Sequence, residues 1–361
     1  MKSASGGNFE NYIIGLSPMD GITDEAFRLT QCEIAKPDII FTEFVSAEGL
    51  AHNAVKLFDH LLFSPTERPI VAQLFGKDPP SFYFAALILC HLGFDGIDIN
   101  LGCPAKTVTQ HGGGAALINN PVLVSEIVLS VKKAINDFQT DLKILSKQKP
   151  KKKVFEVINR NLKYSYPPLA CLAGRWVKEG LGEIVIPTLS LKTRLGIDRS
   201  VVNTWIPHLC SLKPDFITLH GRTLKQGFSG AADWDQISIA AQICYDSGTK
   251  ILGNGDLTSR QMALDYCQKY HTDGALIGRA AMGNPWLFAD REVDFQEKFK
   301  AMLQHAQHFV TVFPDRRFDP LRRHFLLYVS GHPHARALRQ KIVALSGFDQ
   351  LCSLEAEITN C

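Results

Sequence analysis

Short apolar runs rich in β-branched residues alternate along this chain with segments whose apolar residues recur at helical spacing. Runs such as IVAQLFG and FITLHG are almost continuously apolar, as expected for parallel strands buried on both faces. The pattern predicts strands at Ile13–Pro18, Asp38–Glu43, Ile70–Phe75, Gly96–Asn100, Leu189–Leu195, Phe216–Gly221, Ile251–Asp256 and Gly274–Gly278. It predicts helices between them, among others at Asp24–Ile34, Pro79–His91, Pro121–Asn136, Trp234–Asp246 and Ser259–Tyr270. Eight such repeats favour an α/β (β/α)₈ TIM barrel, with an open doubly wound sheet as the alternative.

Two segments depart from this repeat. An insert at 137–187 separates the fourth helix from the fifth strand, and it opens with a run of lysines between Lys143 and Lys153. Such a run is typical of a solvated loop, and contact with a polyanion is the alternative. We expect the run Lys147–Lys153 to be mobile.

The second departure is the C-terminal part, where only helical spacing continues. Helices are predicted at Gln296–Val312 and Pro320–Leu345. We therefore expect a catalytic barrel over 1–294 and an all-helical domain over 295–361. Between Asp315 and Lys341 there are six Arg and one Lys against two acidic residues, which favours contact with nucleic-acid phosphates over a merely charged helix face.

Composition narrows the class of protein further. The 361 residues are 45% apolar, enough for a large core, while the net charge of +3 says little about partners. No apolar run reaches the roughly 18 residues of a membrane-spanning helix, and the N-terminus lacks a secretory pattern. The nine cysteines are scattered without a C-x-x-C pair, which suggests neither a disulfide framework nor a metal site. A monomer in the cytoplasm, without a membrane partner, is the expectation.

Polar side chains stand where the predicted strands end, and in a TIM barrel these ends meet at the active-site face. Lys192 and His220 end the fifth and sixth strands. Groups of this kind stabilise the anion of a reduced flavin, and the amide of Gln73 suits the edge of a flavin ring. Glycine-rich segments follow the seventh and eighth strands, where such barrels commonly bind phosphate, and Arg279 adds a cationic fork.

Cys103 follows the fourth strand in the segment GFDGIDINLGCPAK. An unperturbed thiol has a pKa of about 8.5 and is mostly protonated at neutral pH. It can therefore act as a general acid beside the predicted cofactor. A buried, inert cysteine is the alternative, and it is our interpretation of most of the other eight.

These stretches together resemble the bacterial-type, FMN-dependent tRNA-dihydrouridine synthase family. The resemblance lies in SPMDGITDEAFR, FTEFVSAEGL, VAQLFGKDP, GFDGIDINLGCPAK, LKTRLG, LHGRT, GNGD and DGALIGRAAMGNPWLF, which occur in the family's order. A weaker match, HFLLYVSGHPHARALRQKI, resembles the family's helical tRNA-binding domain. The insert is not part of the family's usual pattern.

The resemblance implies an oxidoreductase that reduces the C5–C6 double bond of uridines in tRNA, with bound FMN and with NADPH as reductant. Hydride would pass from the flavin to C6, and Cys103 would protonate C5 of a uridine flipped from its stack. The implied FMN-binding residues are Pro18, Met19, Asp20, Gln73, Lys192, His220, Asn254, Gly255, Asp256, Gly278 and Arg279. The expected tRNA contacts are Asn100, Lys106, Arg194, Arg336 and Arg339.

Two other functions remain as alternatives. One is an FMN barrel that acts on a free pyrimidine, as the dihydroorotate dehydrogenases do. The other is a tRNA-binding protein without turnover. The basic tail and the HGRT and GCP segments favour a polynucleotide substrate, and the presence of Cys103, Lys192 and His220 argues against a protein without turnover.

Overall fold

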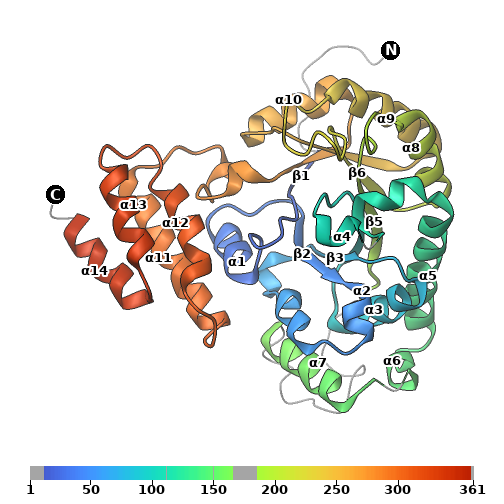
Figure 1. Ribbon diagram of the computed structural model, residues 1–361, viewed down its shortest axis with the longest axis horizontal. Helices are drawn as coiled ribbons and strands as arrows, with labels where there is room; N and C mark the ends of the chain where they lie inside the picture. Colours follow the sequence, from blue (N-terminus) through green and yellow to red (C-terminus); the bar gives the residue numbers. More distant parts are fainter. Residues whose placement is uncertain (1–11, 111, 149, 166–184, 359–361) are drawn as a thin grey trace.

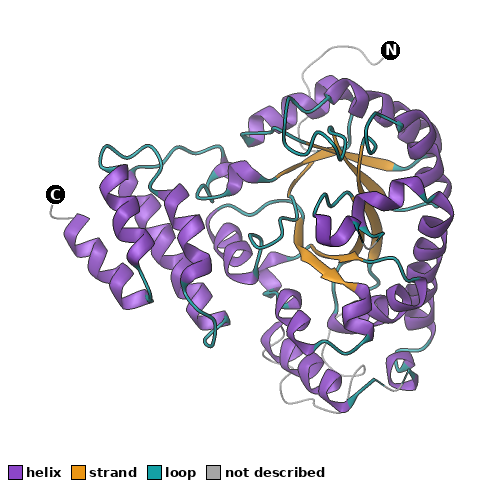
Figure 2. Ribbon diagram, viewed as in Figure 1, coloured by secondary structure: helices purple, strands orange, loops and turns teal. Residues whose placement is uncertain are grey.

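The eight predicted strands close into a barrel. In the computed structural model, which describes residues 12–110, 112–148, 150–165 and 185–358, neighbouring strands pair in parallel in the order β1 to β8, and β8 returns to β1 (Figures 1 and 2). The strands are β1 Ile13–Leu16, β2 Ile40–Ser46, β3 Ile70–Phe75, β4 Gly96–Leu101, β5 Thr188–Arg194, β6 Phe216–His220, β7 Lys250–Asn254 and β8 Gly274–Ile277. The (β/α)₈ prediction is confirmed, and the open sheet is excluded.

Helices surround the barrel, and most begin at residues whose side chains cap them. Asp24, Asp78, Asn120, Asp233 and Ser259 each accept a hydrogen bond from a backbone N–H in the first turn of the helix that follows. These helices are α1 Glu25–Ile34, α3 Pro79–Leu92, α5 Pro121–Thr140, α9 Trp234–Ser247 and α10 Arg260–Tyr270, and α8 covers Val202–Ser211. Shorter elements are α2 Ala47–Ala51, α4 Lys106–Thr109 and the 3₁₀ turns η2 Val55–Leu61, η3 Pro65–Glu67, η4 Gly114–Asn119, η6 Arg279–Ala281, η7 Leu287–Ala289 and η8 Asp319–Leu321.

The barrel interior changes from apolar to polar along the strands. Its amino-terminal end is filled by Phe41, Val71, Phe216 and Leu252, and Leu276, in register with Asn254, completes this apolar cluster. Side chains two positions further along a strand point to the same face, and there the interior holds Gln73 and Asn254. The apolar plug thus supports a polar layer at the carboxyl ends of the strands.

The insert is largely helical where the structure describes it. Helix α5 extends to Thr140, and α6 Ile144–Lys147 and α7 Lys152–Ser165 follow. Val154 and Ile158 of α7 are fully buried, and the side-chain amide of Asn161 donates to the backbone oxygen of Phe58 in η2 at 2.8 Å. The expected loop is therefore wrong for Lys147, which lies in α6, and for Lys152 and Lys153, which lie in α7, because apolar residues at helical spacing anchor that helix. Residues 166–184, the later part of the insert, lie outside the described residues.

Within the residues described, up to 358, four α-helices form the C-terminal part, which lies beside α1 of the barrel (Figure 1). They are α11 Phe295–Val312, α12 Arg322–Tyr328, α13 Ala335–Ala344 and α14 Phe348–Ile358. The single helix predicted over Pro320–Leu345 is wrong, because the chain breaks between α12 and α13, where Gly331 has a φ of 82° and Pro333 follows. Nowhere in the described part of the chain is a helix both long and apolar enough to cross a bilayer.

Candidate active site at the mouth of the barrel

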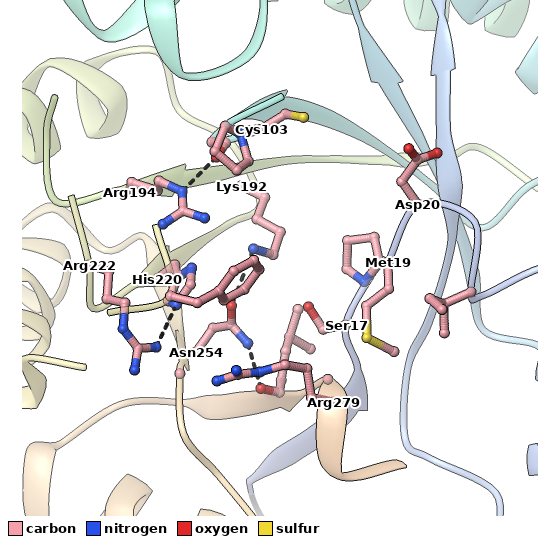
Figure 3. A pocket seen from close by; sticks show the side chains of 18 of the residues that line it. Ser17, Met19, Asp20, Cys103, Lys192, Arg194, His220, Arg222, Asn254 and Arg279 are labelled. Carbon is pink, nitrogen blue, oxygen red and sulfur yellow. Dashed lines mark hydrogen bonds between the residues drawn. The ribbon is translucent and has the colours of Figure 1, made fainter. Parts of the chain in front are cut away.

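A cavity of about 790 Å³ opens at the carboxyl ends of the strands. All the residues predicted to hold the cofactor line it, together with Cys103, Asn100 and Arg194. Figure 3 shows the basic side chains of Lys192, His220, Arg222 and Arg279 on one side of it and Asp20 on the other. Residues far apart in sequence thus face one space of cofactor size.

The loop that carries Cys103 is held by the side chain of Asn100. Its Oδ1 accepts from the backbone N–H groups of Gly102 and Cys103 at 3.0 and 2.8 Å. Its Nδ2 donates to Oε1 of Gln73 at 2.8 Å. Asn100 thereby fixes the position of the thiol as well as lining the cavity.

Gln73 continues this network across three strands. Its Nε2 donates to Oδ2 of Asp98 at 2.7 Å, and the Ser190 hydroxyl donates to Oδ1 of Asp98 at 2.6 Å. Burial raises the pKa of Asp98 to about 6, against the opposing effect of these hydrogen bonds. The side chain of Gln73, which the sequence assigns to the cofactor, therefore has protein partners for both its oxygen and its nitrogen.

Arg194 and Gly114 complete the support of the Cys103 loop. Nε of Arg194 donates to the backbone oxygen of Gly102 at 2.7 Å, and Arg194 is almost fully buried. Gly114 has a φ of 60°, and a Cβ there would lie 3.0 Å from the backbone oxygen of Cys103. Only glycine combines that backbone conformation with this close approach. Arg194, expected to contact the substrate, thus also acts as a brace for the loop.

Cys103 is buried, with 7% of the residue exposed. Burial raises the pKa of the thiol, and Asp20 adds to the rise, while Arg194 and Lys192 oppose it. Cys103 therefore carries its proton at neutral pH, which is the state that a proton donor needs.

Lys192 lies inside the barrel, with its amine in the polar layer. Its Nζ donates to Oδ1 of Asn254 at 3.3 Å, and Nδ2 of Asn254 donates to the backbone oxygen of Leu276 at 2.8 Å. Burial lowers the pKa of Lys192 to about 8, and the nearby charge of Arg194 contributes. An anionic group bound beside this amine would therefore be stabilised by its positive charge.

His220 is held in its neutral form next to Arg222. Nη1 of Arg222 lies 3.3 Å from Nε2 of His220. Since a guanidinium only donates, Nε2 is the acceptor and the ring proton is on Nδ1. Burial, followed by the charges of Lys192, Arg194, Arg222 and Arg279, lowers the pKa of His220 to about 2. His220 therefore offers an N–H donor without a charge of its own.

Asp256 forms ion pairs with two arginines at the rim of the cavity. Nη2 of Arg222 donates to both carboxylate oxygens of Asp256, at 2.7 and 2.5 Å, and Nη2 of Arg279 lies 3.2 Å from Oδ1. Burial works to raise the pKa of Asp256, but Arg222 and Arg279 outweigh it and lower the pKa. Asp256, expected to touch the cofactor, also orients the cations beside it.

Arg279 extends from this pair toward solvent. Its side chain is 58% exposed, and its guanidinium stacks over the Phe228 ring at 4.9 Å. A Cβ placed on Gly278, the preceding residue, would meet only Met19 and Ser17, at 3.4 Å or more. The backbone at Gly278 is thus open toward the cavity beside a partly free cation.

Two of the predicted tRNA contacts, Arg336 and Arg339, lie away from the cavity lining. Lys106 is the first residue of α4, directly after Ala105, which does line the cavity. Arg336 and Arg339 are exposed on α13 in the C-terminal helices. The structure therefore separates the predicted contacts into a set at the reaction centre and a set at the surface.

Sequence reasoning missed Arg222, which makes more hydrogen bonds at the rim than Arg279 does. Its signal was present, since it stands two residues after His220 in the segment LHGRT. Sequence reasoning also missed Glu43, which lies near Asp20. Glu43 accepts a hydrogen bond from the backbone N–H of Gly21 at 2.5 Å and contacts Nδ1 of His60 at 2.8 Å. Burial, with Glu43 contributing, raises the pKa of the neighbouring Asp20.

The fold and the site define a (β/α)₈ barrel protein with a cation-rich cavity and a protonated thiol. Residues 15–161 and 172–359 match the family described as Dihydrouridine synthase (Dus). The chain belongs to the dihydrouridine synthase family, as its resemblance predicts. The family match spans both the barrel and the C-terminal helices.

Comparison with individual proteins leads to the same family. The chain is 29% identical over 337 residues to a probable tRNA-dihydrouridine synthase of Staphylococcus aureus strain COL, covering 91% of this chain and 87% of that protein. It is 28% identical over 352 residues to the probable tRNA-dihydrouridine synthase 2 of Bacillus subtilis strain 168, covering 94% and 91%. Among solved structures, histamine dehydrogenase from Rhizobium sp. 4-9 aligns with a TM-score of 0.46 and 12% identity, over 82% of this chain and 49% of that one.

Proposed function

We propose that this protein is a tRNA-dihydrouridine synthase that reduces the C5–C6 double bond of uridines in tRNA, with bound FMN and with NADPH as reductant. One observation carries the proposal: the protonated Cys103 thiol opens into the same cavity as Lys192, His220 and Arg279. Membership of the dihydrouridine synthase family supports the reaction. The names of the bacterial relatives support tRNA as the substrate.

The residues present fit FMN. Lys192, Arg222 and Arg279 face the cavity, and Asp256 neutralises only part of their charge. Burial and the charge of Arg194 lower the pKa of Lys192, and burial with the charges of the surrounding lysine and arginines lowers the pKa of His220. An anionic cofactor relieves the surplus, and the open backbone at Gly278 with Arg279 suits its phosphate.

When bound, the flavin supplies the hydride that is added at C6 of the uracil ring. Residues of the protein support this transfer through their charges and through the orientation of their hydrogen-bond donors. Lys192 holds a positive charge in the polar layer, and His220 contributes an N–H donor at Nδ1, so both favour negative charge beside them. Arg222 and Asp256 keep His220 in this tautomer and in place.

Cys103 moves the proton. Its Sγ–H donates to C5 as the hydride adds at C6, so that one hydride and one proton saturate the double bond. The resulting thiolate recovers its proton from solvent. Asn100 and Arg194 hold the loop so that the thiol stays at the cavity wall. The target uridine must leave its stack to reach this enclosed thiol.

The proposal is tested with the purified protein under anaerobic conditions. NADPH is expected to bleach the flavin absorbance, and unmodified transcribed tRNA is expected to restore it while dihydrouridine appears in the RNA. Uridine and orotate at the same concentration are the controls. Restoration by either of them as fast as by tRNA indicates a free-pyrimidine enzyme. Tight tRNA binding without flavin or dihydrouridine indicates a non-catalytic protein.

A further inference from the structure

Two arginines from segments far apart in sequence meet at one carboxylate outside the cavity. Asp59 lies in η2, and its Oδ1 is 2.9 Å from Nη2 of Arg160 in the insert helix α7. Its Oδ2 is 3.6 Å from Nη2 of Arg316, which lies between α11 and α12 of the C-terminal helices. We call Arg160, Asp59 and Arg316 the junction. It holds two positive charges against one negative charge.

The insert brings much of this protein's positive charge to that side. Between residues 141 and 165 there are eight basic and two acidic residues, a net charge of +6. Because the whole chain carries only +3, the remainder is net negative. Lys151 and Lys153 are exposed, and neither has a carboxylate within ion-pair distance in the described part of the chain. The field around the junction thus favours a polyanion.

Both arginines are held by packing but remain accessible. Helix α7 is anchored by buried Val154 and Ile158 and by the Asn161 hydrogen bond to η2. Arg316 stacks over the Phe313 ring at 3.9 Å. The side chains of Arg160 and Arg316 are still 52% and 33% exposed. A rigid pair of forked donors of this kind suits a phosphate oxygen better than a flexible lysine does.

The peptide bond from Asp59 to His60 and two hydrogen bonds of Glu43 connect the junction to the cavity. His60 follows Asp59 directly, and its Nδ1 contacts Oε2 of Glu43 at 2.8 Å. Oε1 of Glu43 accepts from the backbone N–H of Gly21, the residue after the cavity-lining Asp20. Figure 1 shows α7 below the barrel, near the lower end of the C-terminal helices. The junction therefore lies close to one edge of the cavity.

We propose that Arg160 and Arg316 together bind a backbone phosphate of the tRNA beside the cavity, so that the insert is part of the RNA-binding surface. This inference rests on the proposed function, because it takes tRNA as the substrate. In this arrangement Asp59 preorients the two guanidinium groups and competes with the phosphate for them.

Binding of unmodified transcribed tRNA, titrated at several salt concentrations, tests the inference. Arg160→Gln and Arg316→Gln are each expected to weaken binding about three- to tenfold and to lower the salt slope by about one. Lys269→Gln is the matched control, because Lys269 is an exposed residue of α10, on the opposite side of the barrel in Figure 1. It should change neither quantity. Equal effects of all three substitutions, or no effect of the first two, overturn the inference.

Asp59→Asn separates phosphate binding from a purely structural role, because the two predict opposite signs. Removal of the competing carboxylate is expected to tighten tRNA binding about threefold and to steepen its salt dependence. If the junction only fastens the insert to the C-terminal helices, Asp59→Asn and Arg160→Gln both lower the melting temperature. In that case neither variant changes tRNA binding by the folded protein, and the inference is overturned. Unchanged binding by Arg160→Gln while the wild type forms dihydrouridine refutes the inference alone. Absence of any tRNA binding by the wild type refutes the proposed function as well.

Discussion

The cavity wall and the basic outer surface both gather positive charge, but they hold it differently. In the cavity, Arg222 is buried, Lys192 is partly buried, and both have hydrogen-bond partners in fixed geometry. On the surface, Arg336 and Arg339 project from α13 into solvent. A buried charge acts in a medium that screens it weakly, whereas water and salt screen an exposed one. Single changes in the cavity should therefore have large, specific effects, and surface changes should have small effects that add together.

The largest effect is expected for Cys103→Ala. The change removes the only proton donor assigned to the tRNA half-reaction, and general acid catalysis contributes about 10²- to 10⁴-fold. Flavin content and the rate of flavin reduction by NADPH should be unchanged, while dihydrouridine formation falls by that factor. Single-turnover kinetics of each half-reaction measure both. A variant that converts tRNA at the wild-type rate shows that Cys103 is not the acid.

Arg279→Ala should have the next largest effect, on flavin affinity. A charge-assisted hydrogen bond contributes roughly 1.5–3 kcal/mol, so its loss weakens flavin binding about tenfold or more. Arg279→Lys is the matched control and should retain part of the affinity, since it keeps the charge but not the fork. Flavin retained after dilution and gel filtration is the measurement. Full occupancy in the Ala variant contradicts the assignment of the phosphate site.

Lys192 should make flavin binding in the cavity depend on pH, unlike tRNA binding by the surface arginines. Burial lowers its pKa from 10.5 to about 8, so the amine of the flavin-free protein is charged below that pH and neutral above it. An anionic cofactor favours the charged form and raises the pKa. Flavin affinity should therefore fall as pH rises from 7 to 9, by up to about tenfold, with proton uptake on binding near pH 8.5.

Calorimetry in buffers of different ionisation enthalpy measures this uptake directly. Lys192→Met removes the titrating group and should abolish both the proton uptake and the pH dependence in this range. If the variant keeps the wild-type profile, another group titrates, and the lowered pKa of Lys192 plays no part in cofactor binding.

The same contrast between cavity and surface explains which features the sequence predicts. Strand ends can be predicted because apolar runs stop at residues such as His220 and Asn254, and parallel strands bring these ends together. The ion pair between Arg222 and Asp256 cannot be predicted from the sequence. It joins residues that follow two different strands, and only the closed barrel sets the register between these strands. Reasoning from single strand ends therefore finds the lining of the cavity but not its internal hydrogen bonds.

On the surface, helical spacing alone predicts one helix too long and leaves another helix, α7, unpredicted. The spacing continues through Pro320–Leu345, but Gly331 and Pro333 end the helix there, because no core contact overrides their backbone preferences. In the insert, the lysines indicate a solvated loop, whereas Val154 and Ile158, buried and four residues apart, are the signal that α7 packs on η2. The junction depends on that packing, so it was beyond sequence reasoning.

The smallest effects are expected at the surface, and here the two basic segments are compared with each other. Arg336→Ala with Arg339→Ala removes two charges three residues apart on α13, neither of which has a carboxylate partner in the described part of the chain. The double variant should weaken tRNA binding whatever the tRNA sequence and reduce its salt slope by about one to two. Flavin reduction by NADPH should be unchanged, because the cavity lies in the barrel.

Lys151→Ala with Lys153→Ala is the matched change in the insert, and it should reduce the slope by less. Within the lysine run, Lys147 is already paired with Asp141 at 2.6 Å and Lys152 with Glu156 at 3.8 Å, so part of its charge is neutralised in the free protein. Holding long lysine side chains against a phosphate also costs up to about 2 kcal/mol each in side-chain entropy. If the lysine pair lowers the slope more than the arginine pair, the insert is the principal RNA contact. The assignment of residues 295–361 as the tRNA-binding domain is then wrong, and the surface depends on α7 rather than on α13.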